Sequence, residues 1–439
     1  MPTITPQWCW TPAGLREGLA IELQGSAIAA IRPRRPDEPV QAGRLALPGL
    51  VNAHSHAFQR AFRGHVQWRD AGSDDFWTWR DRMYRTANAL DPEGVEAVSA
   101  LCFLEMALSG VTRVGEFHYL HHQPDGAPYA DPDELALRVL AAAERVGLGI
   151  TLLRVAYLRG GPGAPLRPDQ RRFGDPSAEA VLAAVSRLQA HRSERVRIGL
   201  APHSVRAVPA DALRALAAFD GPVHAHVSEQ PAENEGARLE HGRSPLQVFD
   251  DAGLVTERFV AVHLTWPLPG DLERLLRAGA SVCVCPSTEL DLGDGFLPVE
   301  ARELPRLCLG SDSHAVIDLL GEARTLELHA RALAGKRNVL APPGARDGLA
   351  ERLLRAATTE GDRALGGAGE GLAVGAPADL ALLDLRRVAA DGVPPLQAAA
   401  FVATPEWVDE VWVAGRRIVA GGVHAEAEAI RRAAAPWLG

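Results

Sequence analysis

The chain has 439 residues, of which 47% are apolar and 23% are charged, and its formal net charge at pH 7 is −9. This balance is that of a globular protein with one large domain or several ordinary ones. The acidic net charge argues against nucleic acids and membrane surfaces as partners, because both attract basic faces. Five scattered cysteines, no apparent signal peptide and no long apolar run predict a reducing, cytoplasmic location.

The sequence pattern changes along the chain. Residues 1–46 contain short strand-like runs and turns, and from about residue 47 short apolar runs alternate with helical stretches rich in Ala, Leu and Arg. The expected strands cover 45–54, 111–120, 149–158, 195–204, 221–230, 258–265, 279–288 and 306–314. The clearest helical stretches are 133–147, 177–192, 210–219 and 270–279. Apolar strands that alternate with helices predict an α/β fold with a parallel, TIM-like (β/α)₈ barrel.

After about residue 366 the pattern changes again. The stretch "GGAGEG" follows no strand and opens no helix, which favours a linker turn over a phosphate-binding loop. Strand-like runs come after it. We therefore predict a barrel over 47–366 and a small β-sandwich domain built from 1–46 and 367–439.

Polar residues gather at the ends of the expected barrel strands, where the active sites of such barrels form. They are His54, His56, His203, Arg206, His226, Glu229, His263 and Asp312. Residues i and i+2 of a strand point to one side, so His54 and His56 can face the barrel mouth together. The same rule leaves His224 deeper, as a core residue.

A lone strand histidine is more often a packed core residue than a ligand. Four histidines and an aspartate at one barrel face are hard to explain by packing. Three imidazoles and a carboxylate suit Zn²⁺ or a similar divalent ion with an open position for water. We expect one divalent metal ion, with Zn²⁺ as the first choice.

Several spaced motifs, "PGLVNAHSH", "HAHVSE", "VAVHLT" and "LGSDSH", resemble the amidohydrolase superfamily in the same order over nearly the whole chain. The resemblance implies four metal ligands, which are His54, His56, His226 and Asp312. It also implies three catalytic residues, which are Glu229, His263 and Asp312.

The lysine content bears on the number of metal ions. Two-metal members of this superfamily bridge their ions with a carboxylated lysine on the fourth barrel strand. Here that strand, 195–204, has no lysine, and Lys336 is the only lysine in the chain. The sequence therefore predicts a one-metal site, which in this superfamily is typical of deaminases.

The expected roles follow from this chemistry. A metal ion can lower the pKa of a bound water to ~7. Asp312 can then take a proton from that water, and His263 can hydrogen-bond the water and the tetrahedral intermediate. Glu229, three residues after His226, can carry the proton to a nitrogen that leaves as ammonia.

The substrate candidates surround the same barrel mouth. They are Gln59, Arg80, Tyr119, His203 and Arg206. Arg80 lies in an unusually long segment between the first two strands, and such segments are often substrate lids. Two arginines in one cavity predict an anionic substrate, because guanidinium pairs with carboxylates bidentately.

A narrower resemblance rests on "HSHAFQRAFRG", "FWTWRDRMY", "GEFHYLHH", "APHSVRAV" and "GSDSHAVIDLLGEARTLE", which are similar to the family of formimidoylglutamate deiminases. It implies hydrolysis of N-formimino-L-glutamate, a small dicarboxylate, to N-formyl-L-glutamate and ammonia in histidine degradation. It also implies a homodimer, in which Arg80 serves its own cavity or that of a neighbouring subunit.

Two other functions stay open. A deaminase of an aminated purine or related ring would use the same metal site, with aromatic stacking in place of two arginines. A barrel that has lost catalysis would be a binding or assembly protein, although such proteins usually lack some of the ligands.

Three further groups are given structural roles. His118, His121 and His122 are interpreted as loop histidines of a substrate segment and not as a second metal site. Cys283 and Cys285 are interpreted as small core residues. The arginines 60 and 63 are expected to be structural.

Overall fold

The computed structural model describes residues 2–69, 72, 75–304 and 306–438. Eight parallel strands form one sheet in the order β14-β13-β12-β11-β10-β9-β8-β7. They are β7 (Leu50–Ser55), β8 (Val111–His118), β9 (Gly149–Ala156), β10 (Val196–Pro202), β11 (Val223–Val227), β12 (Phe259–His263), β13 (Ser281–Val284) and β14 (Leu307–Leu309). The predicted eight-stranded barrel is confirmed.

The barrel is nearly closed where its first and last strands meet. An isolated parallel bridge joins Ser55 to Asp312. The backbone N–H of His56 donates to the carbonyl of Asp312 over 3.2 Å, and the N–H of Asp312 donates to the carbonyl of His54 over 3.1 Å. These bonds place the end of the first strand beside the residue that follows the last one.

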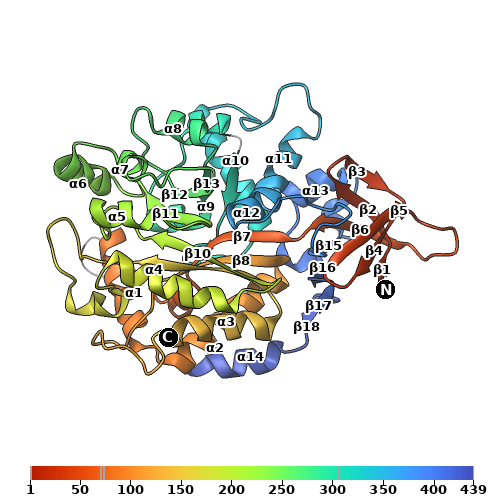
Figure 1. Ribbon diagram of the computed structural model, residues 1–439. Coiled ribbons are helices and arrows are strands. Elements are labelled where there is room, and N and C mark those ends of the chain that lie inside the picture. The colour runs from red at the N-terminus through yellow and green to blue at the C-terminus, as the bar shows by residue number, and fades with distance from the viewer. Residues whose placement is uncertain (1, 70–71, 73–74, 305, 439) are drawn as a thin grey trace.

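Helices surround the barrel (Figure 1). They are α1 (Phe76–Ala89), α2 (Pro92–Leu108), α3 (Glu134–Val146), α4 (Ala178–Leu188), α5 (Ala210–Leu216), α6 (Pro231–His241), α7 (Pro245–Asp251), α8 (Asp271–Ala278), α9 (Pro286–Leu292), α10 (Leu319–Ala334), α11 (Gly348–Ala356) and α12 (Thr359–Ala364). The four predicted helices coincide with α3, α4, α5 and α8. Their ends follow local chemistry: the Ser177 hydroxyl caps α4, and Gly147, at φ 86°, ends α3.

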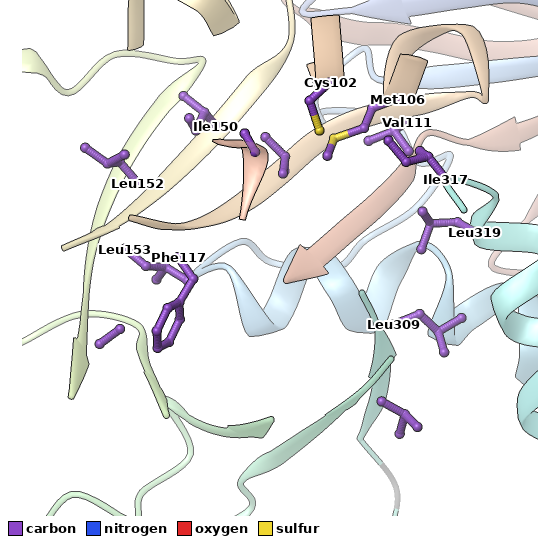
Figure 2. Close-up of a cluster of buried hydrophobic side chains, with 14 of the residues drawn as sticks. Cys102, Met106, Val111, Phe117, Ile150, Leu152, Leu153, Leu309, Ile317 and Leu319 are labelled. Carbon is purple, nitrogen blue, oxygen red and sulfur yellow. The ribbon is translucent and has the colours of Figure 1, made fainter. Parts of the chain in front are cut away.

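The hydrophobic core lies between the strands and these helices. Figure 2 shows part of it, in which Cys102 and Met106 of α2 lie near Val111 of β8, and Leu309 of β14 lies near Leu319. These side chains are fully buried. Burying one large apolar side chain contributes about 1.5–3 kcal/mol, so this layer fixes the strand ends rigidly.

The chain ends form two further sheets. One is β1-β4-β5, with β1 (Thr3–Ile4), β4 (Leu19–Gln24) and β5 (Ala27–Pro33). The other is β18-β17-β16-β15-β6-β2-β3, with β2 (Pro6–Thr11), β3 (Gly14–Glu17), β6 (Gln41–Pro48), β15 (Leu380–Asp384), β16 (Val408–Val413), β17 (Arg416–Ala420) and β18 (Val423–His424). Ile21 and Leu23 of the first sheet share a core with Leu380 and Leu382 of the second. The predicted sandwich of both chain ends is confirmed (Figure 1).

The expected strand 45–54 is wrong as a single element. It divides at Gly49 into β6, which pairs with β15 of the sandwich, and β7, which pairs with β8 of the barrel. A side chain at Gly49 would overlap Thr112, so only glycine lets the chain pass from one sheet to the other here.

The limits 1–46, 47–366 and 367–439 stay a prediction. Beyond residue 366 the chain also forms α13 (Pro395–Phe401), which packs against α10 and α11, and α14 (Ala427–Ala434), which packs against α2. Two helices of the C-terminal segment thus contact the barrel helices (Figure 1). Among the described residues, none of the helices combines the length and apolarity that crossing a membrane requires.

Candidate metal-dependent active site

Four predicted ligands converge at the C-terminal ends of the barrel strands. The Nε2 atoms of His54 and His56 lie 3.3 and 3.2 Å from Oδ1 of Asp312. The Nε2 atom of His226, on β11, lies 3.2 Å from that of His54. The sequence placed these residues on three different strands. In the fold the ligand atoms of His54, His56 and Asp312 lie within 4.8 Å of one another, as do those of His54, His226 and His263.

The charge states in this cluster suit a divalent cation. Burial lowers the pKa of His54 to about 3 and holds that of His226 well below its ordinary value, so both rings are neutral at neutral pH. Burial alone would raise the pKa of Asp312, but the rings of His54, His56 and His263 around it hold it well below the usual range. Neutral imidazoles and an ionised carboxylate are the donors that Zn²⁺ binds.

A residue that the sequence did not single out orients this cluster. Glu116 of β8 is buried, and its carboxylate accepts a hydrogen bond from the Ser55 hydroxyl over 2.6 Å and one from the N–H of Ala57 over 2.8 Å. The ring of His56 makes a 3.0 Å hydrogen bond through Nδ1 with the carbonyl of Phe117, which leaves Nε2 for a metal ion. A glutamate near the end of the predicted strand 111–120 was the available signal for Glu116.

His263, at the end of β12, lies among three carboxylates. Its Nε2 is 3.7 Å from Glu229 and 3.8 Å from Asp312, and its Nδ1 is 3.4 Å from Glu289. Burial lowers the pKa of His263, but Glu229, Glu289 and Asp312 outweigh it and raise the pKa to about 10. The ring can therefore act as a hydrogen-bond donor. Glu289 is a second residue that the sequence reasoning missed.

A further group of possible ligands consists of His263, Cys285 and Glu289. Burial holds the pKa of the Cys285 thiol well above its ordinary value, so the thiol is protonated. Glu289 already accepts the Cys285 N–H over 2.8 Å. Cys283 and Cys285 pack in a small core with Cys308, which confirms their interpretation as core residues. The His54 cluster is the better metal site.

A cavity of about 310 Å³ opens above the cluster. All five predicted substrate residues line it: Gln59, Arg80, Tyr119, His203 and Arg206. The other candidates on its wall are His56, His226, Glu229, His263 and Asp312. His54 is fully buried, and Arg80 of α1 faces the cavity of its own chain.

The candidate substrate contacts have clear local environments. Gln59 donates to the Tyr119 hydroxyl over 3.0 Å. Arg80 lies over the ring of Trp77 at 4.5 Å from its centre. Arg206 pairs with Glu229 over 3.2 Å, which the sequence did not indicate. One of the two arginines is therefore already bound to the expected proton carrier.

Other wall residues were missed. Helix α1 contributes an aromatic side to the cavity with Phe76, Trp77, Trp79 and Tyr84, and Tyr157 follows β9. The dense aromatic stretch "FWTWRDRMY" was the available signal. Glu233 of α6 also lines the cavity and is buried.

Several residues outside the metal cluster were predicted to have structural roles. The arginines 60 and 63 both pair with Glu105, and His224 bonds the carbonyl of Ala364, so these residues are structural as predicted. Lys336 is exposed after α10, away from the cluster. His118, His121 and His122 do not line the cavity, although Tyr119 of the same segment does, so their place in a substrate segment stays a prediction; His118 ends β8 and is not in a loop.

Comparisons with known proteins agree over the whole length. The amidohydrolase family profile matches residues 45–418. A formimidoylglutamate deiminase of Pseudomonas aeruginosa is 39% identical, over 100% of this chain and 99% of the length of that relative. An 8-oxoguanine deaminase of the same species is 30% identical, over 93% of this chain and 90% of the length of that relative. Among solved structures, an amidohydrolase from Brucella melitensis aligns with a TM-score of 0.93 at 35% identity, over 100% and 99% of the chains. A zinc-bound adenosine deaminase from Xanthomonas campestris aligns with a TM-score of 0.84 at 24% identity, over 99% and 97%, and supports the fold.

Proposed function

The chain belongs to the amidohydrolase family and is a hydrolase of C–N bonds, and we propose that its substrate is N-formimino-L-glutamate, which it converts to N-formyl-L-glutamate and ammonia in histidine degradation. The observation that carries the proposal is one cavity with a His/Asp cluster at its floor and two arginines, Arg80 and Arg206, on its wall. A dicarboxylate needs such cations, and an amidine carbon needs an activated water.

The metal ion would be held by His54, His56, His226 and Asp312, and Zn²⁺ is the ion that this donor set favours. When bound, such an ion makes a hydroxide nucleophile available near neutral pH. Asp312 accepts a proton at Oδ2, the oxygen that faces His263. His263 donates a hydrogen bond from Nε2 to the oxygen that attacks.

Glu229 carries the proton to the leaving nitrogen. Its Oε1 lies 3.7 Å from Nε2 of His263, on the cavity side of the cluster. A carboxylate here can take a proton and return it to the nitrogen, which then leaves as neutral ammonia. General acid–base help of this kind contributes about 10²–10⁴-fold to the rate.

The dicarboxylate would be held by Arg80 and Arg206, with Gln59, Tyr119 and His203 as further hydrogen-bonding groups. Gln59 and Tyr119 are buried and hydrogen-bonded to each other, which orders both side chains before a ligand binds, and the unpartnered Oε1 atom of Gln59 can accept a hydrogen bond from the ligand. Ordered polar groups cost less entropy when a ligand binds.

A second candidate, a purine-ring deaminase, has one observation in its favour. Trp77, Tyr84 and Tyr157 give the cavity an aromatic side, and aromatic rings bind flat heterocycles by stacking. Arg80 opposes it, because its guanidinium lies over aromatic rings and a neutral purine would give it no counter-charge.

The test is ammonia release by the zinc-loaded protein from N-formimino-L-glutamate, 8-oxoguanine and adenosine in parallel. We expect turnover of the first substrate with N-formyl-L-glutamate as the product. Turnover of a purine alone would overturn the proposal. Metal analysis and light scattering on the same sample test one metal ion per chain and the homodimer.

A further inference from the structure

Glu233 is a buried acid that no role described above uses. It lies in the first turn of α6, it is 1% exposed, and it lines the cavity. Its Oε2 accepts the N–H of Glu229 over 3.4 Å, whereas its Oε1 is buried without a hydrogen-bond partner. A carboxylate oxygen left in this state is costly and calls for a reason.

The nearest charged groups are Arg206 and Glu229. The Nε atom of Arg206 lies 3.9 Å from Oε2 of Glu233 and is itself buried without a hydrogen-bond partner. The other side of the guanidinium, Nη2, lies 3.2 Å from Oε2 of Glu229. Arg206 is thus placed between two carboxylates, with its shorter contact to Glu229.

This arrangement poses a conflict for the proposed reaction. Glu229 must take up a proton, and an arginine bound to it opposes protonation. Arg206 must also meet a substrate carboxylate, and an arginine bound to Glu229 is less available. Both needs are met if Glu233 holds the guanidinium through Nε, because Nη2 can then leave Glu229 and meet the substrate carboxylate.

We propose that Glu233 is a positioning residue that offers Arg206 a second counter-charge, so that Arg206 can leave Glu229 and bind a carboxylate of the substrate. The inference rests on the proposed function, since it assigns Arg206 to a dicarboxylate. Besides Arg206 and Glu229, the charged group that faces Glu233 is His263. Glu233 acts only through Arg206 and Glu229 and does not touch the reacting atoms.

The test compares Glu233→Gln and Glu233→Asp with the wild type. Glu235→Gln is the matched control, because Glu235 lies on the same helix but is exposed and pairs with Arg238. Three quantities are measured on each zinc-loaded protein: the Kd for glutarate by calorimetry, kcat and KM for N-formimino-L-glutamate, and Tm. Glutarate tests the carboxylate contacts without any chemistry.

We expect Glu233→Gln to raise the Kd for glutarate and the KM at least about 10-fold, and to lower kcat by a smaller factor. Glu233→Asp, which keeps the charge, should restore part of the glutarate affinity and part of the KM. Glu235→Gln should match the wild type. A lower Tm with unchanged Kd and KM would mean that Glu233 only supports the fold, and tighter glutarate binding would mean that it only neutralises Arg206. Either result overturns the inference.

If Glu233→Gln does not fold, the test rests on Glu233→Asp. We expect this variant to raise the Kd for glutarate at least about 3-fold, and an unchanged Kd would contradict the inference. Failure of the proposed function looks different. A wild type that binds glutarate but does not turn over the substrate refutes the substrate, and the comparison of Kd for glutarate and of Tm among the Glu233 variants still tests the inference.

Discussion

The chain carries two groups of clustered histidines, and they differ in what their ring nitrogens face. In the first group, His54 and His226 place their Nε2 atoms 3.2 Å apart, beneath a cavity. In the second, His121 bonds the carbonyl of Val155 over 3.0 Å and His122 that of Gly174 over 2.9 Å.

The second group is the denser one in the sequence, yet the Nε2 atoms of His121 and His122 face backbone carbonyls, and Arg154 also contacts Nε2 of His121. The first group is spread over more than 170 residues, yet its nitrogens converge. A metal site therefore depends on ligand atoms that face one another and lack other partners, and closeness along the chain is a poor guide to it. The predictions below test this difference.

The largest effect is expected from removing one ligand of the first group. His226→Asn should lose the metal ion and lower kcat/KM by at least about 10³-fold, because the ion supplies several kcal/mol of stabilisation. His122→Asn, in the second group, should keep one metal ion per chain. Metal analysis by mass spectrometry and the ammonia assay measure both. Equal metal loss in the two variants would contradict the difference between the two groups of histidines.

Next in size is the removal of the proton carrier beside the first group. Glu229→Gln should retain the metal ion and lower kcat by about 10²–10⁴-fold, since the amide cannot accept the proton. The exposed residue Glu235 is again the control. A Glu229→Gln enzyme with full metal content and a wild-type rate would remove Glu229 from the mechanism.

A smaller effect is expected on the cavity wall. Arg206→Ala should lower kcat/KM by about 10- to 100-fold through a higher KM, because a hydrogen-bonded charge contact is worth about 1.5–3 kcal/mol. Arg238→Ala, on the surface of α6, should leave KM unchanged. KM is measured by initial rates, and an unchanged KM in Arg206→Ala would show that Arg206 does not bind the substrate.

The smallest effect concerns the second group and acid. Burial and then Arg154 lower the pKa of His118 to about 3, whereas the unfolded chain has the ordinary value of 6.5. The folded state therefore disfavours the protonated ring, and the stability contributed by His118 is complete above pH 6.5 and is lost as the pH falls toward 3.

The variant His118→Gln has no such titration. The unfolding free energy of the wild type minus that of the variant should therefore fall by about 1.4 kcal/mol between pH 7.5 and 5.5, of which about 1 kcal/mol is lost between pH 6.5 and 5.5. Urea denaturation at pH 7.5, 6.5 and 5.5 measures this difference, and metal content should stay constant. A difference that is constant or grows on acidification would contradict the direction.

The sequence by itself determined the barrel, because buried parallel strands are apolar along their whole length and alternate with helices. It also determined which residues stand at the strand ends, so His54, His56, His226, His263 and Asp312 were found before the fold. It excluded a lysine-bridged site, since Lys336 is the only lysine.

Only the tertiary structure decided which atoms meet. It divided the expected strand 45–54 at Gly49, a position where Thr112 of the neighbouring strand leaves no room for a side chain. It left His118, His121 and His122 off the cavity wall that Tyr119 lines, and it brought Glu233 to Arg206 across 27 positions of sequence. Strand periodicity fixes the direction of a side chain within its own strand, whereas the partner of a buried charge depends on how separate strands and helices pack.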